Sequence, residues 1–234
     1  PIVIVAASRT PMGGMLGALS EVAAPQLGAS TIAAALSRSG LNPAEIDQVI
    51  MGCVLPAGLG QAPARQAALG AGLSLETGCV TINKMCGSGM KAVMDAHDQI
   101  LAGTSAVVIA GGMENMSAAA YALPQARFGY RMNVPPTGMI DMMVNDGLHC
   151  AMNNIHMGLT AENICDQWNL TREELDQFAA ASQQKAEAAI AAGRFRDEIV
   201  PVPIPQRKGN PVLFDTDEHY TPGTTVEKIA KLRP

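Results

Sequence analysis

The 234-residue sequence predicts an α/β fold in which helices cover both faces of a β-sheet. Apolar runs of strand length alternate along its first half with segments that have helical spacing. The runs are rich in β-branched residues and apolar at nearly every position, which is typical of strands buried on both faces. We expect these strands at residues 2–7, 48–54, 78–83 and 105–112.

Helical spacing and capping signals place helices between these strands. An amphipathic stripe recurs at positions i, i+3, i+4 and i+7 and ends at Gly40; its members are Ala29, Ile32, Ala33 and Leu36. A short helical turn follows, with Asn42 as N-cap and Glu45 three residues after it. Two further helices are expected at residues 64–72 and 88–102.

The pattern changes at about residue 117, where prolines, glycines and scattered methionines replace the regular alternation. We therefore expect two domains. Residues 1–117 form an N-terminal α/β domain, and residues 118–234 form a second, loop-rich domain.

Regular structure returns later in the second domain. Helical spacing runs through residues 157–168, and Thr171 with Glu174 forms a capping box that starts another helix. Gly193 ends that helix. Strand-like runs on either side of the polar turn QRKGN, residues 206–210, predict a hairpin.

Composition excludes several classes of protein. Hydrophobic residues make up 48% of the chain and aromatic ones only 3%, with a net charge of −5, which argues against a nucleic-acid platform. No apolar run is long enough to span a bilayer, and the first residues lack the features of a signal peptide. The chain begins without Met, so we expect processing or trimming there.

The five cysteines are odd in number and never spaced C-x-x-C. This usage favours a reducing compartment, and we expect a cytoplasmic location. His149, Cys150 and His156 are the best candidates for metal ligands, but their spacing matches no zinc pattern, so no metal is expected.

Cys86 occupies a glycine-rich turn in the segment TINKMCGSGMKAVMDA, residues 81–96. It would lie between a strand and a helix, where unpaired N–H groups and the helix dipole favour a thiolate. A tight strand-to-helix turn also projects a reactive side chain, and its backbone N–H groups can stabilise an oxyanion. The alternative is a buried thiol in a packing turn, and the residues by themselves leave both interpretations open.

No histidine near Cys86 in the sequence can activate it. His97 follows eleven residues later, roughly 16 Å along the predicted helix, so we expect a packed, hydrogen-bonded structural role for it. His156 precedes a helix in a loop, where residues commonly meet ligands. The glycine-rich segments fit neither a dinucleotide-binding fingerprint nor a P-loop, which disfavours a nucleotide-dependent oxidoreductase.

Several segments together resemble the thiolase family, in order along essentially the whole chain. The segment around Cys86 is the most specific of them. The matching segments are AASRTPMGG (6–14), GQAPARQAA (60–68), INKMCGSGMKAV (82–93), GGMENMS (111–117), HMGLTAEN (156–163) and AKLRP (230–234).

The resemblance implies a thiolase-like N-terminal domain, a mixed sheet covered by helices, with an inserted α+β loop domain. It also implies an acyltransferase that condenses two acetyl-CoA molecules to acetoacetyl-CoA and CoA, or performs the reverse thiolysis. Cys86 would carry the acetyl group and supply part of the oxyanion hole through its own N–H. Coenzyme A thioesters would be substrate and product, with no permanently bound cofactor.

The same resemblance implies the remaining site residues. His156 and Met157, with Leu148 nearby, would line the pantetheine and acyl end, as in biosynthetic, short-chain members. Where many such members have an Arg and a Ser for the CoA nucleotide, the matching positions are Thr221 and Lys228. The stretch around residues 125–135 corresponds to the excursion that joins dimers into tetramers, so a homo-oligomer, a dimer of dimers, is expected.

Thiolases also have a C-terminal half that this sequence lacks. That half supplies an Asn-Glu motif, a His that activates the nucleophile and a second Cys that deprotonates the incoming acetyl group. The 234 residues alone are therefore expected to be inactive in condensation until that half is present. Two alternatives are a 3-ketoacyl-CoA thiolase of longer-chain specificity and a non-catalytic, thiolase-like acyl-CoA or lipid carrier.

Overall fold

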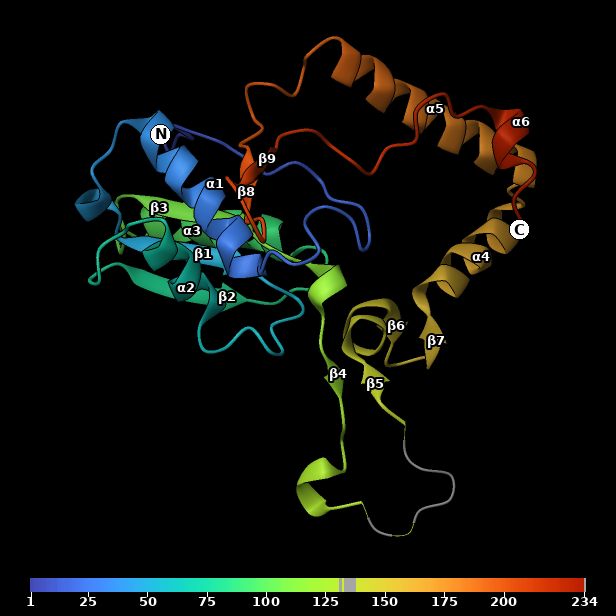
Figure 1. Cartoon of the computed structure of the whole chain (residues 1–234), viewed down its shortest axis with the longest axis horizontal. Coiled ribbons are helices and arrows are strands. Elements are labelled where there is room, and N and C mark those ends of the chain that lie inside the picture. The colour runs from blue at the N-terminus through green and yellow to red at the C-terminus, as the bar shows by residue number, and fades with distance from the viewer. Residues whose placement is uncertain (131, 133–137, 234) are drawn as a thin grey trace.

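A three-stranded parallel sheet forms the centre of the N-terminal half (Figure 1). The computed structural model describes residues 1–130, 132 and 138–233. The sheet order is β2-β1-β3, with β1 (Gln48–Gly52) between β2 (Gly78–Ile82) and β3 (Val108–Gly112). Both pairings are parallel and in register from end to end, so the three strands finish at the same edge.

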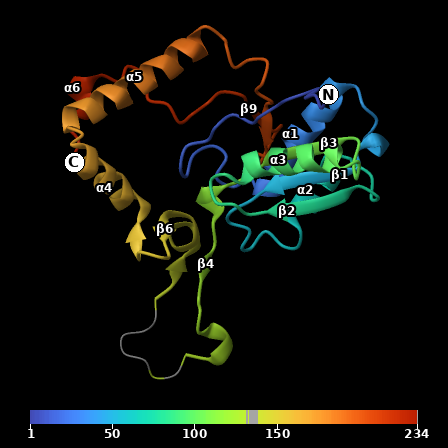
Figure 2. The same cartoon turned by 180° about the vertical axis from the view of Figure 1, so that it is seen from behind.

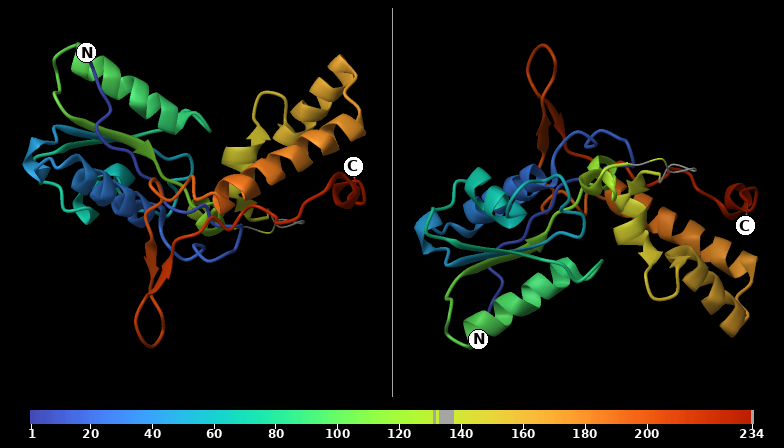
Figure 3. Two further views of the ribbon diagram at one scale, coloured as in Figure 1. Left: turned by 90° about the horizontal axis from the view of Figure 1, so that it is seen from above. Right: turned by 90° about the horizontal axis from the view of Figure 1, so that it is seen from below.

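Helices cover both faces of this sheet, as Figure 3 shows. The helices α1 (Ala24–Ser39) and α2 (Pro63–Gly70) share one face, and α3 (Ser88–Leu101) lies on the other. The side chains of β1 alternate accordingly: Val49 and Met51 pack with α1 and α2, whereas Ile50 packs with α3. All three are almost fully buried, at 0%, 2% and 1% exposed. The predicted α/β class is confirmed.

Local signals set the ends of the helices. Gly40 follows α1 in the left-handed conformation, with φ 70°, where a residue without a Cβ is favoured. The predicted turn at Asn42 is the 3₁₀ helix η1 (Pro43–Glu45), and its capping box is present. Thr171 accepts a hydrogen bond from the Glu174 N–H and caps α5 (Arg172–Ala191).

The second half consists of short elements followed by two longer helices (Figures 1 and 2). The short elements are η2 (Met116–Ala118), β4 (Tyr121–Ala122), η3 (Ala126–Phe128), β5 (Ile140–Asp141), the π-helix η4 (Met143–Leu148), β6 (His149–Cys150) and β7 (Ile155–His156). They are followed by α4 (Met157–Trp168), α5, β8 (Val202–Ile204), β9 (Val212–Phe214) and α6 (Val226–Ile229). Residue 131 and residues 133–135 of the predicted tetramer-forming stretch lie outside the described residues.

The predicted hairpin is β8 paired with β9, and it returns to the N-terminal half. Val202 of β8 is 2% exposed and packs with Leu19 and Val22, which precede α1, and with Leu27 in the first turn of α1. Just beyond the hairpin, Glu218 accepts a hydrogen bond from the Gly14 N–H at 2.8 Å. The hairpin and the chain after it are therefore held against residues 14–27.

Three expectations are corrected. Residues 2–7 do not form a strand, and Val3, Ile4 and Val5 are 68%, 82% and 64% exposed, because no described strand pairs with them. The expected strand at 105–112 begins only at Val108, and the main sheet is parallel rather than mixed.

The long helix α5 also differs from its sequence pattern. Leu175 and Phe178 recur at helical spacing, which is typical of a buried face, yet Phe178 is 79% exposed and Leu175 is 39% exposed. The buried residues of α5 are Asp176 and Ala180. The burial of the Asp176 carboxylate is compensated by Arg172, which donates to it at 2.7 Å and also donates to the Ile229 carbonyl of α6 at 3.0 Å.

Candidate active site

Cys86 lies in the turn that joins β2 to α3, at the carboxyl edge of the sheet. It is an exposed free cysteine, so the alternative of a buried packing thiol is wrong. Met85 directly before it has a φ of 49°, a left-handed conformation that is uncommon for a residue with a side chain. Such backbone strain persists only where surrounding contacts hold it in place.

Hydrogen bonds within the turn supply part of that restraint. The Ser88 hydroxyl donates to the Met85 carbonyl at 2.6 Å and accepts from the Lys84 N–H at 2.8 Å. Ser88 is 4% exposed, so these bonds are shielded from water. The Met85 N–H donates to the side-chain oxygen of Asn83 at 2.9 Å.

Two glycines let the start of α3 approach the strand ends closely. A Cβ on Gly52 at the end of β1 would lie 2.6 Å from Ser88 Cβ, and one on Gly112 would lie 3.4 Å from Gly89 Cα. Any side chain at Gly52 would therefore push Ser88 away. This close contact holds the Cys86 turn against the sheet edge.

Glu114, directly beyond β3, connects the strand ends. Its carboxylate accepts hydrogen bonds from the Val54 N–H at 2.7 Å and the Leu55 N–H at 3.1 Å. The carbonyl of Val54 in turn accepts from Asn83 Nδ2 at 3.3 Å. Neither Asn83 nor Glu114 was singled out from the sequence, although both stand in the segments that resemble thiolases.

Cys53 shows that a second thiol in this region has a different character. It is 2% exposed, and its Sγ lies 3.7 Å from a Glu114 oxygen. Burial, and then the negative charge of Glu114, raise the pKa of Cys53 to about 12. Cys53 is therefore a neutral, buried thiol, while the sulfur at position 86 is accessible.

Three of the predicted CoA-binding residues lie close together around β6 and β7. Strand pairing puts His149 opposite His156. Leu148, at the end of η4, directly precedes His149, and Met157, at the start of α4, directly follows His156. The pairing therefore brings Leu148 and Met157 near each other. The Nδ1 atom of His156 accepts a hydrogen bond from the Gly158 N–H at 3.0 Å and caps α4. Met157 is 46% exposed.

This cluster is connected to the sheet edge. A Cβ on Gly147, beside Leu148, would lie 3.7 Å from Cδ2 of Leu55, whose N–H is bound by Glu114. A hollow of about 290 Å³ opens beside the cluster. Its lining residues are Ile140, Asp141, Val144, Asn145 and His149.

Lys228 lies elsewhere, in α6 against α5, and Figure 1 shows α4 between α6 and β7. Its Nζ donates to the Gly223 carbonyl at 2.6 Å. The neighbouring Thr221 N–H donates to the Gln183 side chain at 2.8 Å. The structure thus does not bring Lys228 together with Leu148, His156 and Met157.

His97 differs from the expectation of a packed residue. Its side chain is 55% exposed, and its Nδ1 lies 3.2 Å from Asp98. In the described part of the chain, no hydrogen bond joins a histidine to Cys86. The same residues contain no group of three or more His, Cys, Asp or Glu that would hold a metal ion, and no helix of theirs is long and apolar enough to cross a membrane.

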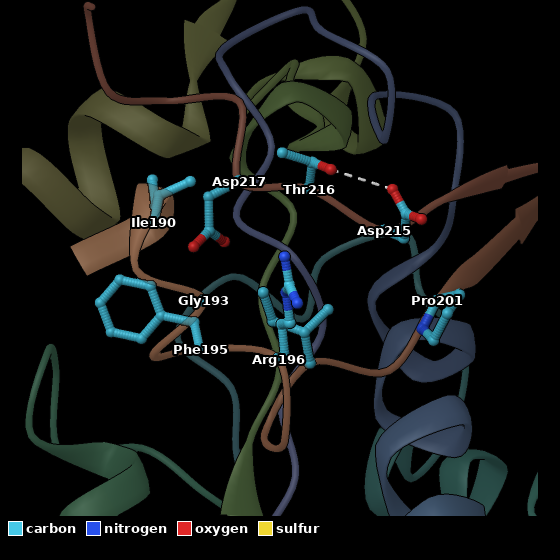
Figure 4. A pocket seen from close by; sticks show the side chains of 9 residues that line it. Ile190, Gly193, Phe195, Arg196, Pro201, Asp215, Thr216 and Asp217 are labelled. Atoms are coloured by element: carbon cyan, nitrogen blue, oxygen red, sulfur yellow. Dashed lines mark hydrogen bonds between the residues drawn. The ribbon is translucent and has the colours of Figure 1, made fainter. Parts of the chain in front are cut away.

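A larger hollow of about 460 Å³ lies between the end of α5 and the chain after β9 (Figure 4). None of its lining residues belongs to the Cys86 turn. They are Ile190, Gly193, Phe195, Arg196, Ile199, Pro201, Asp215, Thr216 and Asp217. Beside it, Arg9 forms ion pairs with Asp217 and Glu198.

The fold and the site define an α/β protein that holds an accessible cysteine at a strained strand-to-helix turn. Comparison with known families gives the particular family: the model of the thiolase N-terminal domain matches residues 2–234. The chain belongs to the thiolase family.

Similar proteins agree with this assignment. The chain is 54% identical to acetyl-CoA acetyltransferase of Pseudomonas aeruginosa and 52% identical to that of Cupriavidus necator, over 233 residues in each case. It is 48% identical to a probable acetyl-CoA acyltransferase of Staphylococcus aureus. The alignments cover 100% of this chain but only 59% of each of these relatives.

Proposed function

We propose that this chain is the nucleophile-bearing part of an acetyl-CoA C-acetyltransferase. The observation that carries the proposal is Cys86, an exposed thiol at a strained turn directly before α3. Unpaired N–H groups and the helix dipole at a helix N-terminus favour negative charge, which is the nucleophilic form of a thiol. The names of the relatives support the same activity.

In the proposed reaction, the sulfur of Cys86 attacks the carbonyl carbon of acetyl-CoA. A carbon–sulfur bond forms, and CoA leaves as a thiolate that takes up a proton. A base then removes a proton from the methyl group of a second acetyl-CoA. The resulting carbanion attacks the acetyl group on Cys86, which forms the carbon–carbon bond of acetoacetyl-CoA and releases the sulfur.

The N–H of Cys86 is the proposed oxyanion donor. The neighbouring N–H groups of Gly87 and Ser88 donate within the turn, to the carbonyls of Lys84 at 3.1 Å and Met85 at 3.0 Å. These two N–H groups therefore stabilise the turn through their own backbone partners. A donor that is fixed before the reaction stabilises the developing negative charge without having to reorganise.

Leu148, His156 and Met157 are proposed to contact the pantetheine and acyl end of CoA. Their grouping around β6 and β7, the adjacent hollow and the contact of Gly147 with Leu55 support this role. Lys228 is proposed to meet the nucleotide end of CoA. Its ammonium group has three N–H donors, and the bond to the Gly223 carbonyl uses one of them.

The base is proposed to lie in the part of the protein that corresponds to the remaining length of the relatives. The chain spans 59% of the Pseudomonas relative, and within the described residues no hydrogen bond supplies Cys86 with a histidine. Condensation by these 234 residues alone is therefore not expected. A domain boundary near residue 117, a homotetramer and a cytoplasmic location are further proposals, which rest on the sequence pattern and the family.

The test uses the complete protein incubated with acetyl-CoA, quenched in acid and digested for peptide mass analysis. We expect the mass of one acetyl group on the peptide that contains Cys86, and none in Cys86→Ala. Acetyl groups only on other cysteines would overturn the assignment.

Steady-state thiolysis with a series of 3-ketoacyl-CoA chain lengths then defines the activity. A preference for acetoacetyl-CoA supports the proposal. A preference for longer chains identifies a 3-ketoacyl-CoA thiolase instead, and binding without turnover identifies a carrier. The Cys86→Ala variant serves as the control for background hydrolysis.

A further inference from the structure

We infer that Asn83 and Glu114 are positioning residues for Cys86, connected to its turn through the backbone of Val54. Their assignment as determinants of acyl transfer rests on the proposed function. Their effect on the presentation of the Cys86 sulfur does not, because that effect is measurable without any acyl substrate.

The strain at Met85 requires a restraint. A residue with a side chain is uncommon in the left-handed region, so we expect a turn with a φ of 49° to relax when its contacts are removed. Relaxation at Met85 moves Cys86, the next residue, relative to the start of α3. Ser88, the first residue of α3, provides one restraint, and Asn83, directly after β2, provides the second.

The side chain of Asn83 uses both ends of its amide. Its oxygen accepts from the Met85 N–H at 2.9 Å, and its nitrogen donates to the Val54 carbonyl at 3.3 Å. An aspartate at this position retains the acceptor and loses the donor. The amide thus joins the Cys86 turn to the chain that leaves β1.

Glu114 fixes the orientation of the Val54 segment. Its carboxylate receives two adjacent N–H groups, those of Val54 and Leu55, at 2.7 Å and 3.1 Å. Hydrogen bonds to an ionised group are shorter and stronger than neutral ones. A glutamine cannot accept both in the same way, because one of its terminal atoms is an NH₂ donor.

Strand pairing holds the ends of this connection. The Met113 N–H, just before Glu114, donates to the Gly52 carbonyl at 3.0 Å, and the Cys53 N–H donates to the Ile82 carbonyl at 3.0 Å. The ends of β3, β1 and β2 are thereby tied in sequence, and Asn83 follows β2 directly. A chain of hydrogen bonds therefore connects the sheet to Met85, the residue before Cys86. It runs through Glu114, Val54 and Asn83.

The experiment compares Asn83→Ala, Asn83→Asp and Glu114→Gln in the complete protein. The first measurement is the rate of Cys86 alkylation by iodoacetamide, followed by peptide mass analysis. We expect a fall of about two- to fivefold in Asn83→Ala and Glu114→Gln, since the turn no longer holds Cys86 in one position. Asn83→Asp retains the Met85 bond and should fall between Asn83→Ala and wild type.

The second measurement is thiolysis of acetoacetyl-CoA. We expect kcat to fall about tenfold or more in Asn83→Ala and Glu114→Gln with little change in KM, because misplacement of a reacting atom affects the transition state and not substrate binding. The matched control is Gln66→Ala, whose amide donates to the carbonyls of Leu59 and Gln61 at 2.8 Å and 2.7 Å, in a different loop. It should lower the melting temperature without changing the alkylation rate or kcat.

The inference would be overturned if Asn83→Ala and Glu114→Gln were alkylated as fast as the wild-type protein while their melting temperatures fell. That result would show that the two residues contribute only to stability. If a variant does not fold, as judged by circular dichroism, the folded variants among the three decide. Absence of thiolysis in the wild-type protein would overturn the proposed function alone. The alkylation rates would still decide the role of Asn83 and Glu114.

Discussion

Arg9 and Asp217 form a bidentate ion pair, with Nη1 2.7 Å from Oδ1 and Nη2 2.9 Å from Oδ2. The same guanidinium donates to Glu198 at 2.5 Å and lies 5.2 Å from the centre of the Phe195 ring. Asp217 also accepts from the Met12 N–H at 2.8 Å, and its side chain is only 12% exposed. One arginine therefore connects residues 9–12 to the chain on both sides of the β8–β9 hairpin.

Replacement of Arg9 by Lys should destabilise the protein even though the charge is kept. An ammonium group cannot reproduce the planar fork that meets both oxygens of Asp217. We expect a loss of about 1–3 kcal/mol in the free energy of unfolding, measured by urea denaturation. Arg207→Lys, at an exposed position in the hairpin turn, is the control and should be neutral. Equal stability of the two variants would contradict the importance of the ion pair.

The same pair predicts a dependence of stability on acid. The hydrogen bond from Arg9 lowers the pKa of Asp217 below its ordinary value of 3.8, so the unfolded state binds this proton more readily than the folded one. The stabilisation is therefore complete above about pH 5 and is lost as the pH falls through the lower, folded pKa. The pKa of Arg9 is raised, so Arg9 stays charged throughout this range.

The free energy of unfolding, measured at a series of pH values from acid to neutral, tests whether stability falls as the pH is lowered. Asp217→Asn should lose stability at neutral pH and show a flatter acid decline than wild type. The exposed Asp197→Asn serves as the comparison and should retain the wild-type profile. A wild-type slope in Asp217→Asn would contradict the assignment.

Cysteine reactivity should differ sharply between Cys86 and Cys53. Cys86 is exposed, whereas Cys53 is 2% exposed with a pKa raised to about 12 by burial and by Glu114. At mildly alkaline pH, iodoacetamide should label Cys86 in the folded protein and leave Cys53 unlabelled. Quantitative peptide mass analysis gives both rates, and labelling in urea provides the control in which both thiols react. Equal rates in the folded protein would refute the prediction.

Substitution of Gly52 by Ala should disturb the Cys86 turn through packing alone. The new Cβ would lie 2.6 Å from Ser88 Cβ and 2.7 Å from the Ser88 carbonyl carbon, too close for either to remain in place. Overpacking of this kind costs about 1–3 kcal/mol of stability, and we also expect slower alkylation of Cys86. Gly138→Ala is the control, since among the described residues, apart from its chain neighbours, no atom lies within 4 Å of the place its methyl group would occupy. Thermal unfolding together with the alkylation rate distinguishes the two.

Local sequence signals predicted most of the regular structure. Gly40, Asn42 and the Thr171–Glu174 capping box mark helix ends because each acts on backbone groups only a few residues away. The predicted strand at residues 2–7 is wrong because a strand depends on a distant partner. An apolar, β-branched run becomes a strand only when another strand supplies hydrogen bonds. Leu175 and Phe178 of α5 are exposed for a related reason: helical spacing alone does not determine which element a helix face packs against.

The sequence by itself determined the α/β class, the turn that carries Cys86 and the family to which the chain belongs. Only the tertiary structure decided what holds that turn and what fastens the hairpin. Arg9 and Asp217 are 208 positions apart, and Val54 and Glu114 are 60 positions apart. No periodicity or capping rule reaches over such separations. The first contact requires the β8–β9 hairpin to pack near residues 9–27, and the second requires the sheet to bring the ends of its strands together.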